Sequence, residues 1–175
     1  MNITLPWQKN KMPESPTQKS CCSDQAESQI FKPFVCPTNG KKGQSVNVKT
    51  LHHLIKPERR SEIKTTGYFF CKTHDCDTVY YHPASGQCFD KSDLTVRIGL
   101  KETEDPVWVC YCFDLSKKMI AEEMKRRGQS ISGNRIREEV AADNCECEIK
   151  NPSGRCCLGE VLAAEKEAQA NLRTL

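Results

Sequence analysis

The sequence predicts an α+β protein in which a small β-rich domain precedes a helical domain. Two observations support this fold class. Up to residue 106 the apolar residues alternate in short runs between turn-forming residues, as in strands, whereas beyond Cys112 they recur about every 3.6 residues, as in helices. Cysteines also gather at the predicted turns of the first part and at the predicted helix ends of the second. We therefore expect three regions, at residues 1–32, 33–106 and 107–175.

The first region, residues 1–32, is rich in Lys, Ser, Gln and Pro and contains only isolated hydrophobic residues. Such a composition cannot bury enough apolar surface to offset the entropy lost on ordering the chain. We therefore expect a disordered N-terminal tail. It contains the adjacent thiols Cys21 and Cys22, which either capture soft metal ions or have no role.

Charge and hydropathy exclude several classes of protein. The 26 Lys and Arg residues against 23 Asp and Glu give a net charge of +3, far below the excess expected of a nucleic-acid-binding domain. The longest apolar stretch, residues 107–113, is too short to span a bilayer, and the N-terminus lacks the basic and apolar segments of a secretory signal. We expect a cytoplasmic protein that neither binds nucleic acid nor inserts into membranes.

The β-rich region, residues 33–106, begins with a turn from Cys36 to Gly40. Alternating residues at 45–50 predict a strand, and residues 51–55 predict a short helix that ends before Pro57. The runs at 67–71 and 78–81 predict a hairpin that presents Cys71 and Cys76, and residues 94–99 predict a further strand.

Cysteines presented from two turns of a small sheet are typical of a structural zinc site with four tetrahedral ligands. Cys36, Cys71 and Cys76 supply three. Asn39 stands where the second cysteine of a Cys-x-x-Cys motif would lie, and a neutral amide is a poor zinc ligand. The fourth ligand must come from His74, Cys88 or the Cys21-Cys22 pair, and we predict His74. The alternative is that the three cysteines are buried as small apolar residues.

In the last region, residues 107–175, three helices are expected. The first has an apolar face at Leu115, Met119, Ile120 and Met124 and should stop at Gly128. The second should be capped by Ser132 and end near residue 144. A type I turn at 151–154 then leads to a final helix at about 160–172, and the first two helices with their link resemble a helix-turn-helix unit.

Six thiols flank these helices: Cys110, Cys112, Cys145, Cys147, Cys156 and Cys157. Cytosolic thiols stay reduced, and a Cys-x-Cys pair is too strained to close readily on itself, so the spacing favours a metal centre over disulfides. Four thiolates bind a [2Fe-2S] cluster, and helix N-termini near the sulfurs would stabilise its negative charge. We predict Cys110, Cys112, Cys147 and Cys157 as its ligands, with Cys145 and Cys156 as alternatives.

Several motifs resemble the N-terminal iron-sulfur and zinc domain of CopZ-type copper chaperones, over about residues 36–161. They are Cys36-Pro-x-Asn-Gly-Lys-Lys-Gly, Tyr68-Phe-Phe-Cys-x4-Cys76-Asp-x-Val-Tyr-Tyr, Val96-Arg-Ile-Gly-Leu-Lys-Glu, Val109-Cys-Tyr-Cys-Phe and Cys147-Glu-x-x-Asn-Pro-Ser-Gly-Arg-Cys-Cys-Leu-Gly159. The resemblance implies a mononuclear zinc domain followed by a helical [2Fe-2S] domain of the bacterioferritin-associated ferredoxin type. In full-length relatives a copper-binding domain with Met-x-Cys-x-x-Cys follows, and this sequence shows no such motif.

These features predict an accessory protein of copper handling, or of another thiophilic metal, that contains zinc and transfers single electrons through a [2Fe-2S] cluster. Its expected partners are a copper or mercury ion, or a metal chaperone or pump. One alternative is a thiol-based Cu(I)/Hg(II) chaperone module that uses the Cys21-Cys22 pair and a thiol such as Cys156. Another is a cluster-dependent sensor. Electron transfer and metal binding require no protein acid, base or nucleophile, so we expect no catalytic residues.

Overall fold

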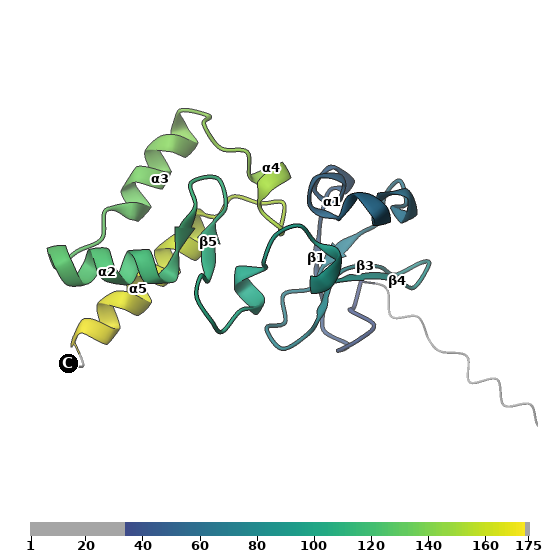
Figure 1. Ribbon diagram of the computed structural model, residues 1–175, viewed down its shortest axis with the longest axis horizontal. Helices are drawn as coiled ribbons and strands as arrows, with labels where there is room; N and C mark the ends of the chain where they lie inside the picture. Colours follow the sequence, from purple (N-terminus) through teal and green to yellow (C-terminus); the bar gives the residue numbers. More distant parts are fainter. Residues whose placement is uncertain (1–33, 174–175) are drawn as a thin grey trace, which may run out of the picture. The chain divides into compact units, whose positions relative to one another are not determined.

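The computed structural model describes residues 34–173, and the predicted N-terminal tail with Cys21 and Cys22 lies outside the described residues. The first half holds a four-stranded antiparallel sheet whose strands are in chain order (Figure 1). These strands are β1 (Gln44–Ser45), β2 (Phe69–Phe70), β3 (Thr78–His82) and β4 (Gln87–Asp90). The predicted hairpin is present as β2 and β3, with Phe70 opposite Tyr80, and β4 pairs with the other edge of β3, with Cys88 opposite Tyr81.

Helix α1 (Val48–Leu54) begins one turn earlier than the sequence predicts, because the Asn47 side chain accepts a hydrogen bond from the Lys49 amide and caps the helix. Of the strand predicted over residues 45–50, only Ser45 therefore lies in a strand, at the end of β1. Residues 94–98 form no regular strand either, and Leu94 makes only an isolated bridge to Ile55. Short 3₁₀ helices complete this half: η1 (Pro57–Glu62), η2 (Lys91–Asp93) and η3 (Gly99–Lys101).

The core of the first half lies between α1 and the sheet. It is built around fully buried Leu51, Ile55, Val79, Tyr80 and Phe89. A second, smaller cluster on the sheet contains Cys36, Cys71, Cys76 and Tyr81, with Phe69 and Cys88 packed against it. The sheet therefore buries apolar residues under α1 and collects thiols in a separate cluster.

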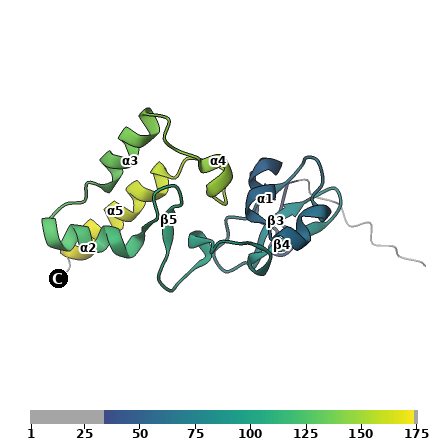
Figure 2. The same cartoon turned by 45° about the horizontal axis from the view of Figure 1, so that its top comes forward.

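The second half starts with a two-stranded hairpin, β5 (Trp108–Cys110) and β6 (Leu115–Ser116), which leads directly into α2 (Lys117–Arg127). Ser116 caps α2 by accepting a hydrogen bond from the Met119 amide, and Gly128 ends it in the left-handed conformation, φ +73°, as predicted. Helices α3 (Ser132–Ala141), α4 (Cys147–Lys150) and α5 (Leu158–Arg173) follow (Figure 2).

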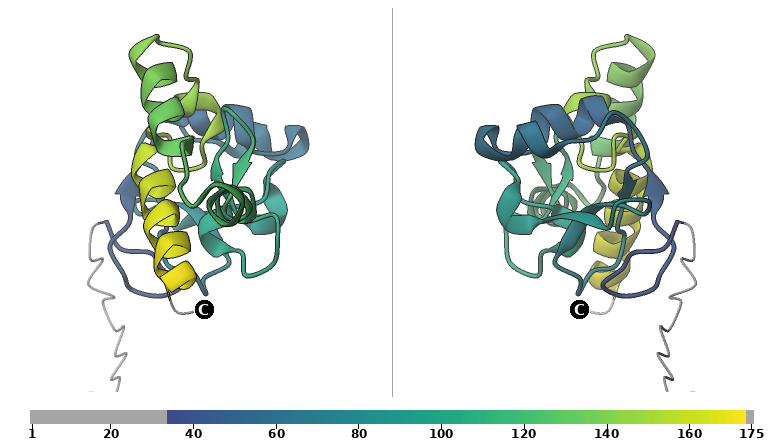
Figure 3. Two further views of the ribbon diagram at one scale, coloured as in Figure 1. Left: turned by 90° about the vertical axis from the view of Figure 1, so that its left-hand side faces the viewer. Right: turned by 90° about the vertical axis from the view of Figure 1, so that its right-hand side faces the viewer.

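The helices of the second half pack through a small apolar core. Helix α5 contacts α2 and α3 (Figure 3), and it contributes Val161, Ala164 and Ala168 against Ile120 and Ile136. Met119, which the sequence places on the apolar face of the first helix, is 48% exposed, and Val140 in α3 is 37% exposed. The one-turn helix α4 is not predicted from the sequence, since a single turn has no periodicity to detect.

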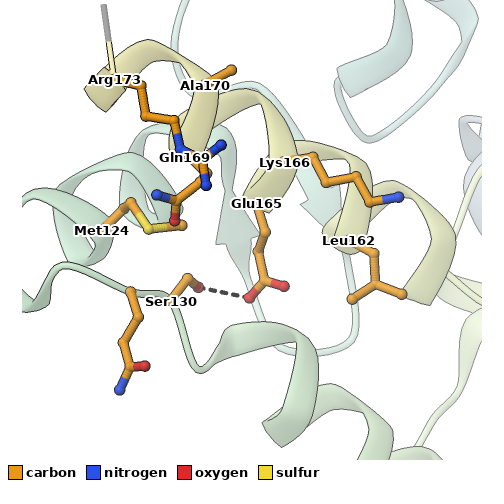
Figure 4. A pocket seen from close by; sticks show the side chains of 9 residues that line it. Met124, Ser130, Leu162, Glu165, Lys166, Gln169, Ala170 and Arg173 are labelled. Atoms are coloured by element: carbon orange, nitrogen blue, oxygen red, sulfur yellow. Dashed lines mark hydrogen bonds between the residues drawn. The ribbon is translucent and has the colours of Figure 1, made fainter. Parts of the chain in front are cut away.

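Two glutamates hold the N-terminus of α3. Glu165 Oε1 accepts hydrogen bonds from the Gly133 amide at 2.8 Å and from Ser130 Oγ at 2.7 Å. Glu123 Oε2 accepts from Ser132 Oγ at 2.8 Å, so Ser132, the predicted helix cap, donates to a distant carboxylate instead of capping α3. Figure 4 shows Glu165 and Ser130 in a groove of about 550 Å³ lined also by Met124.

Replacing Glu165 by alanine should lower the free energy of unfolding by about 1–2 kcal/mol, because the first turn of α3 loses its acceptor. Urea denaturation measures the change. Glu167→Ala is the matched control: that carboxylate pairs on the surface with Lys117 at 2.7 Å, and it should cost no more than about 0.5 kcal/mol. Equal effects of the two substitutions would contradict the assigned role of Glu165.

Candidate metal centres

The first centre is a group of three buried thiols. The Sγ atoms of Cys36, Cys71 and Cys76 lie within 4.8 Å of one another. Cys36 opens a turn closed by a hydrogen bond from the Gly40 amide to its carbonyl at 2.8 Å, Cys71 directly follows β2, and Cys76 lies in the loop before β3. Tetrahedral zinc with bonds of about 2.3 Å places its sulfurs roughly 3.8 Å apart. The Cys36–Cys76 distance of 3.9 Å fits that geometry.

The surroundings of this triad favour the thiolate form of Cys71 and oppose that of Cys36. Asn39 does not point its oxygen at the centre; its Nδ2 donates a hydrogen bond to Cys71 Sγ at 3.2 Å. Burial opposes ionisation of Cys71, but hydrogen bonds from the Thr73 amide and Asn39 and the charge of Lys101 together lower its pKa. Burial raises the pKa of Cys36 to about 11. A cation is therefore needed to hold all three sulfurs as thiolates, and zinc supplies that charge.

Lys101 is a buried cation that the sequence analysis did not single out. It is 4% exposed, and its Nζ donates to the carbonyls of Thr73 at 2.7 Å and Cys76 at 2.8 Å. Its two bonds close the loop between Cys71 and Cys76. Nothing in the sequence predicts its burial, because lysine side chains are almost always exposed to solvent.

Lys101→Met should leave the two carbonyls unpaired and remove a positive charge beside the thiolates, so zinc affinity should fall at least tenfold. Competition with a coloured zinc chelator measures the change. Lys72→Met is the control, since that lysine is exposed in the same loop and should leave affinity unchanged. An unchanged affinity in the Lys101 variant would show that the loop holds its shape without the ammonium group.

The predicted fourth ligand, His74, does not join this group. Its side chain is 51% exposed, and its Nδ1 lies 3.0 Å from the Asp75 carboxylate at the tip of the loop. Cys88, the alternative on β4, is half-buried and packs against the triad. The register that places Cys88 opposite Tyr81 cannot be read from cysteine spacing.

The second group contains the four thiols predicted as cluster ligands. Cys110 ends β5, Cys112 lies in the following loop, Cys147 begins α4, and Cys157 directly precedes α5. The sulfurs of Cys110 and Cys157 are 2.9 Å apart, and those of Cys112 and Cys147 are 3.5 Å apart. Both distances far exceed the roughly 2.05 Å of a disulfide. The structure thus brings the four residues together as two close pairs of free thiols.

The ionisation of these thiols is unequal. The hydrogen bond that Cys157 Sγ donates to Cys110 Sγ lowers the pKa of Cys110 to about 7. Interaction with the Cys157 thiol also lowers the pKa of Cys147 to about 5, and the pKa of Cys157, which keeps its proton in the bond to Cys110, is raised far above its usual range. Burial raises the pKa of Cys112 to about 12. A shared cation would replace the protons in both pairs, so this group also has the chemistry of a metal centre.

The first half supports the loop that joins Cys147 to Cys157. Three side chains donate hydrogen bonds to its carbonyls: Thr50 Oγ1 to Glu148 at 2.6 Å, Tyr80 Oη to Pro152 at 2.8 Å, and Gln44 Nε2 to Ser153 at 3.1 Å. Helix α1 contacts α4, and the two lie side by side in Figure 1 and Figure 2.

The loop that carries Cys110 and Cys112 is also tied to the first half. Tyr111 lies between the two cysteines, and its Oη accepts a hydrogen bond from the Gly99 amide at 2.8 Å and donates one to the Arg97 carbonyl at 3.1 Å. Gly99 belongs to η3, the same short helix that ends at Lys101. Through η3, the hydrogen bonds of Lys101 and Gly99 therefore connect the Cys71–Cys76 loop to the Cys110–Cys112 loop.

A small sheet with a buried thiol triad, followed by helices with paired thiols, defines a cysteine-rich zinc-binding protein of mixed α/β class. Residues 34–95 match the family described as a CopZ-type zinc binding domain. The chain is 32% identical over 139 residues to the copper chaperone CopZ of Archaeoglobus fulgidus, an alignment that spans 76% of this chain and 65% of that protein. It also matches the X-ray structure of the Archaeoglobus fulgidus CopZ N-terminal domain, with a TM-score of 0.62 and 31% identity over 74% of this chain and 95% of that one.

The chain therefore belongs to the family of the CopZ N-terminal domain and contains a zinc-binding CopZ-like domain. The predicted mixed fold with a small sheet and the predicted resemblance to CopZ are confirmed. Among the described residues, no helix has the length and apolarity needed to cross a bilayer. The boundary at residue 107 and the individual ligands stay predictions.

Proposed function

We propose that this chain is a metal-handling protein that binds zinc through Cys36, Cys71 and Cys76 and holds thiophilic metal ions at the thiols of its second half. Copper(I) is the ion best supported, since the relative named above is a copper chaperone and soft thiolate ligands select copper(I). The observation that carries the proposal is the close pairing of four thiols, Cys110 with Cys157 and Cys112 with Cys147, of which all but the half-buried Cys112 are buried.

In this proposal the two halves have different roles. Zinc closes the loops of the first half and stabilises the fold, as in other structural sites with buried thiolates. The paired thiols of the second half bind the transported ion, and burial of Cys110 and Cys157 excludes water and oxidants from it. The partners are then the ion itself and a metal-transport protein that gives or receives it.

Copper(I) titration of the oxygen-free protein against a competing chelator tests this function. The zinc-loaded chain should take copper from the chelator, and Cys112→Ser/Cys147→Ser should lower the copper retained at least tenfold while zinc content stays unchanged. Failure of the unmodified chain to compete for copper would overturn the proposal.

A second candidate is that the same four thiols hold a [2Fe-2S] cluster. It is favoured by their arrangement in two pairs, one for each iron, and by the position of Cys157 at the N-terminus of α5, a helix of 16 residues whose dipole is positive at that end. The cluster would supply one-electron transfer. The thiols would bind it and the surrounding core would shield it.

Absorption and electron paramagnetic resonance spectra of protein purified without oxygen distinguish the two candidates. A cluster would give visible absorption and a reduced S = 1/2 signal, with iron and sulfide in equal amounts. Colourless protein that iron and sulfide cannot reconstitute would leave the copper-binding function as the only one of the two.

A further inference from the structure

A groove lies between α5, the end of α2 and the link to α3, and neither group of thiols uses it (Figure 4). Its volume of about 550 Å³ is that of a site able to receive several side chains. Met124 forms the floor and is 3% exposed, while Leu162 is half-buried and Ala170 is exposed at the edge. The groove therefore has an apolar floor that is open to solvent.

Two cations on α5 line this groove. Lys166 and Arg173 are exposed, and within the described part of the chain neither side chain makes a hydrogen bond or an ion pair. Glu165 also lines the groove, but its Oε1 already accepts hydrogen bonds from Ser130 Oγ and the Gly133 amide. The ammonium and guanidinium groups therefore keep their hydrogen-bond donors for a ligand.

The last turn of α2 adds positive charge. Lys125, Arg126 and Arg127 are exposed, and none of these side chains makes a hydrogen bond or ion pair with a residue of the range 34–173. Arg127 stands two residues before Gln129, which lines the groove. Carboxylates gather at the other end of α3 and in the segment after it: Glu138, Glu139, Asp143 and Glu146. Positive charge therefore concentrates around the groove and negative charge towards Cys147.

The groove is separated from the thiol pairs along α5. Cys157 directly precedes this helix, and Gln169, which lines the groove, follows twelve residues later. At a rise of about 1.5 Å per residue, the two positions are roughly 18 Å apart along the helix axis. A molecule bound in the groove would therefore leave the thiols open to the exchange of a metal ion.

We propose that this groove docks an acidic amphipathic helix of a partner protein. Helices bind such grooves by placing apolar side chains at positions i, i+3, i+4 and i+7 on the floor. Here the apolar face of the helix contacts Met124 and Leu162, and its carboxylates pair with Lys166 and Arg173. A nucleic acid fits less well, because a phosphate backbone has no apolar side chains to cover the floor. The docking site is independent of which metal the thiols hold.

Fluorescence anisotropy of a labelled peptide with the full zinc-loaded chain tests the docking site. The probe is a synthetic helical peptide of about 18 residues with leucine along one face and glutamate elsewhere. It should bind, and Lys166→Glu/Arg173→Glu should weaken binding by about tenfold or more, since like charges would then meet. Lys42→Glu/Lys64→Glu is the matched control: both lysines are exposed in the first half, and the same change of charge should leave binding unaltered.

A second variant tests the apolar groove without altering charge. Ala170→Trp places a large side chain in the groove at an exposed position, so it should block the peptide while the fold stays intact. Ala141→Trp is its control, because it adds the same side chain at an exposed position of α3 outside the groove. This control should bind the peptide as the unmodified chain does.

Three results would overturn the docking site: no binding of the acidic peptide to the unmodified chain, unchanged binding by Ala170→Trp, and equal binding of a peptide with lysine in place of glutamate. Equal binding of polyglutamate or of a DNA duplex, which lack apolar side chains, would reduce the groove to a patch of charge and also overturn it. A dimer of the unmodified chain that Ala170→Trp abolishes, measured by sedimentation, would assign the groove to a second copy instead. None of these measurements depends on copper, so the copper titration decides the proposed function separately.

Discussion

Replacing Cys71 with serine should remove zinc from the first half and lower the free energy of unfolding by more than about 4 kcal/mol. Cys71 is 1% exposed, it accepts the Asn39 hydrogen bond, and its sulfur belongs to the triad. Without it the other two thiols cannot hold a tetrahedral ion, and the Lys101 ammonium group remains buried beside a lost negative charge. Zinc analysis and urea denaturation measure the two effects.

Cys156→Ser is the control for Cys71→Ser, because it replaces an exposed thiol of the second half and should leave zinc content and stability as they are. Retention of one zinc per chain by the Cys71 variant would disprove the triad as the zinc site. The same assay identifies the fourth ligand. We expect Cys88→Ser to weaken zinc binding more than His74→Ala, since Cys88 packs against the triad while His74 pairs with Asp75.

Gly99→Ala should destabilise the protein by about 3 kcal/mol or more and reduce the metal held by the second half. A Cβ atom on Gly99 would lie 1.9 Å from the Trp108 carbonyl oxygen and 2.8 Å from its amide nitrogen. Both are backbone atoms of β5, so no side-chain rotation can relieve the clash. The strand must move, and it carries Cys110 at its end.

The matched control for Gly99→Ala is Gly159→Ala in α5. No atom lies within 4 Å of a Cβ placed there, and its φ is not positive, so alanine should stabilise the helix by roughly 0.5–1 kcal/mol. Thermal unfolding and copper retention are measured on both variants. If Gly99→Ala keeps its stability and its metal, the contact between η3 and β5 is looser than the structure indicates.

The sequence predicts those elements whose signals are local. Gly128 stops α2 because a left-handed residue is needed there, and the cysteine groups fall where turns and helix ends place them. Predictions fail where distant residues decide. The Ser132 hydroxyl donates a hydrogen bond to Glu123, and in place of the strand expected at 94–99 there is an isolated bridge from Leu94 to Ile55. Lys101 donates a hydrogen bond to the Cys76 carbonyl, 25 residues before it in the chain, and the spacing of the cysteines does not predict this contact.

The hydrogen bonds from Thr50, Tyr80 and Gln44 to the segment between Cys147 and Cys157 also constrain how the gene for such a protein can recombine. A recombination event that moved only residues 107–173 into another gene would separate three carbonyl groups from their donors and leave Tyr111 without Gly99 and Arg97. The transferred segment would keep all its cysteines but would lose the hydrogen-bond donors that hold the cysteine-bearing loops in place. The two halves are therefore expected to be inherited together, and insertions are expected at the exposed residues Gly128 and Gln129.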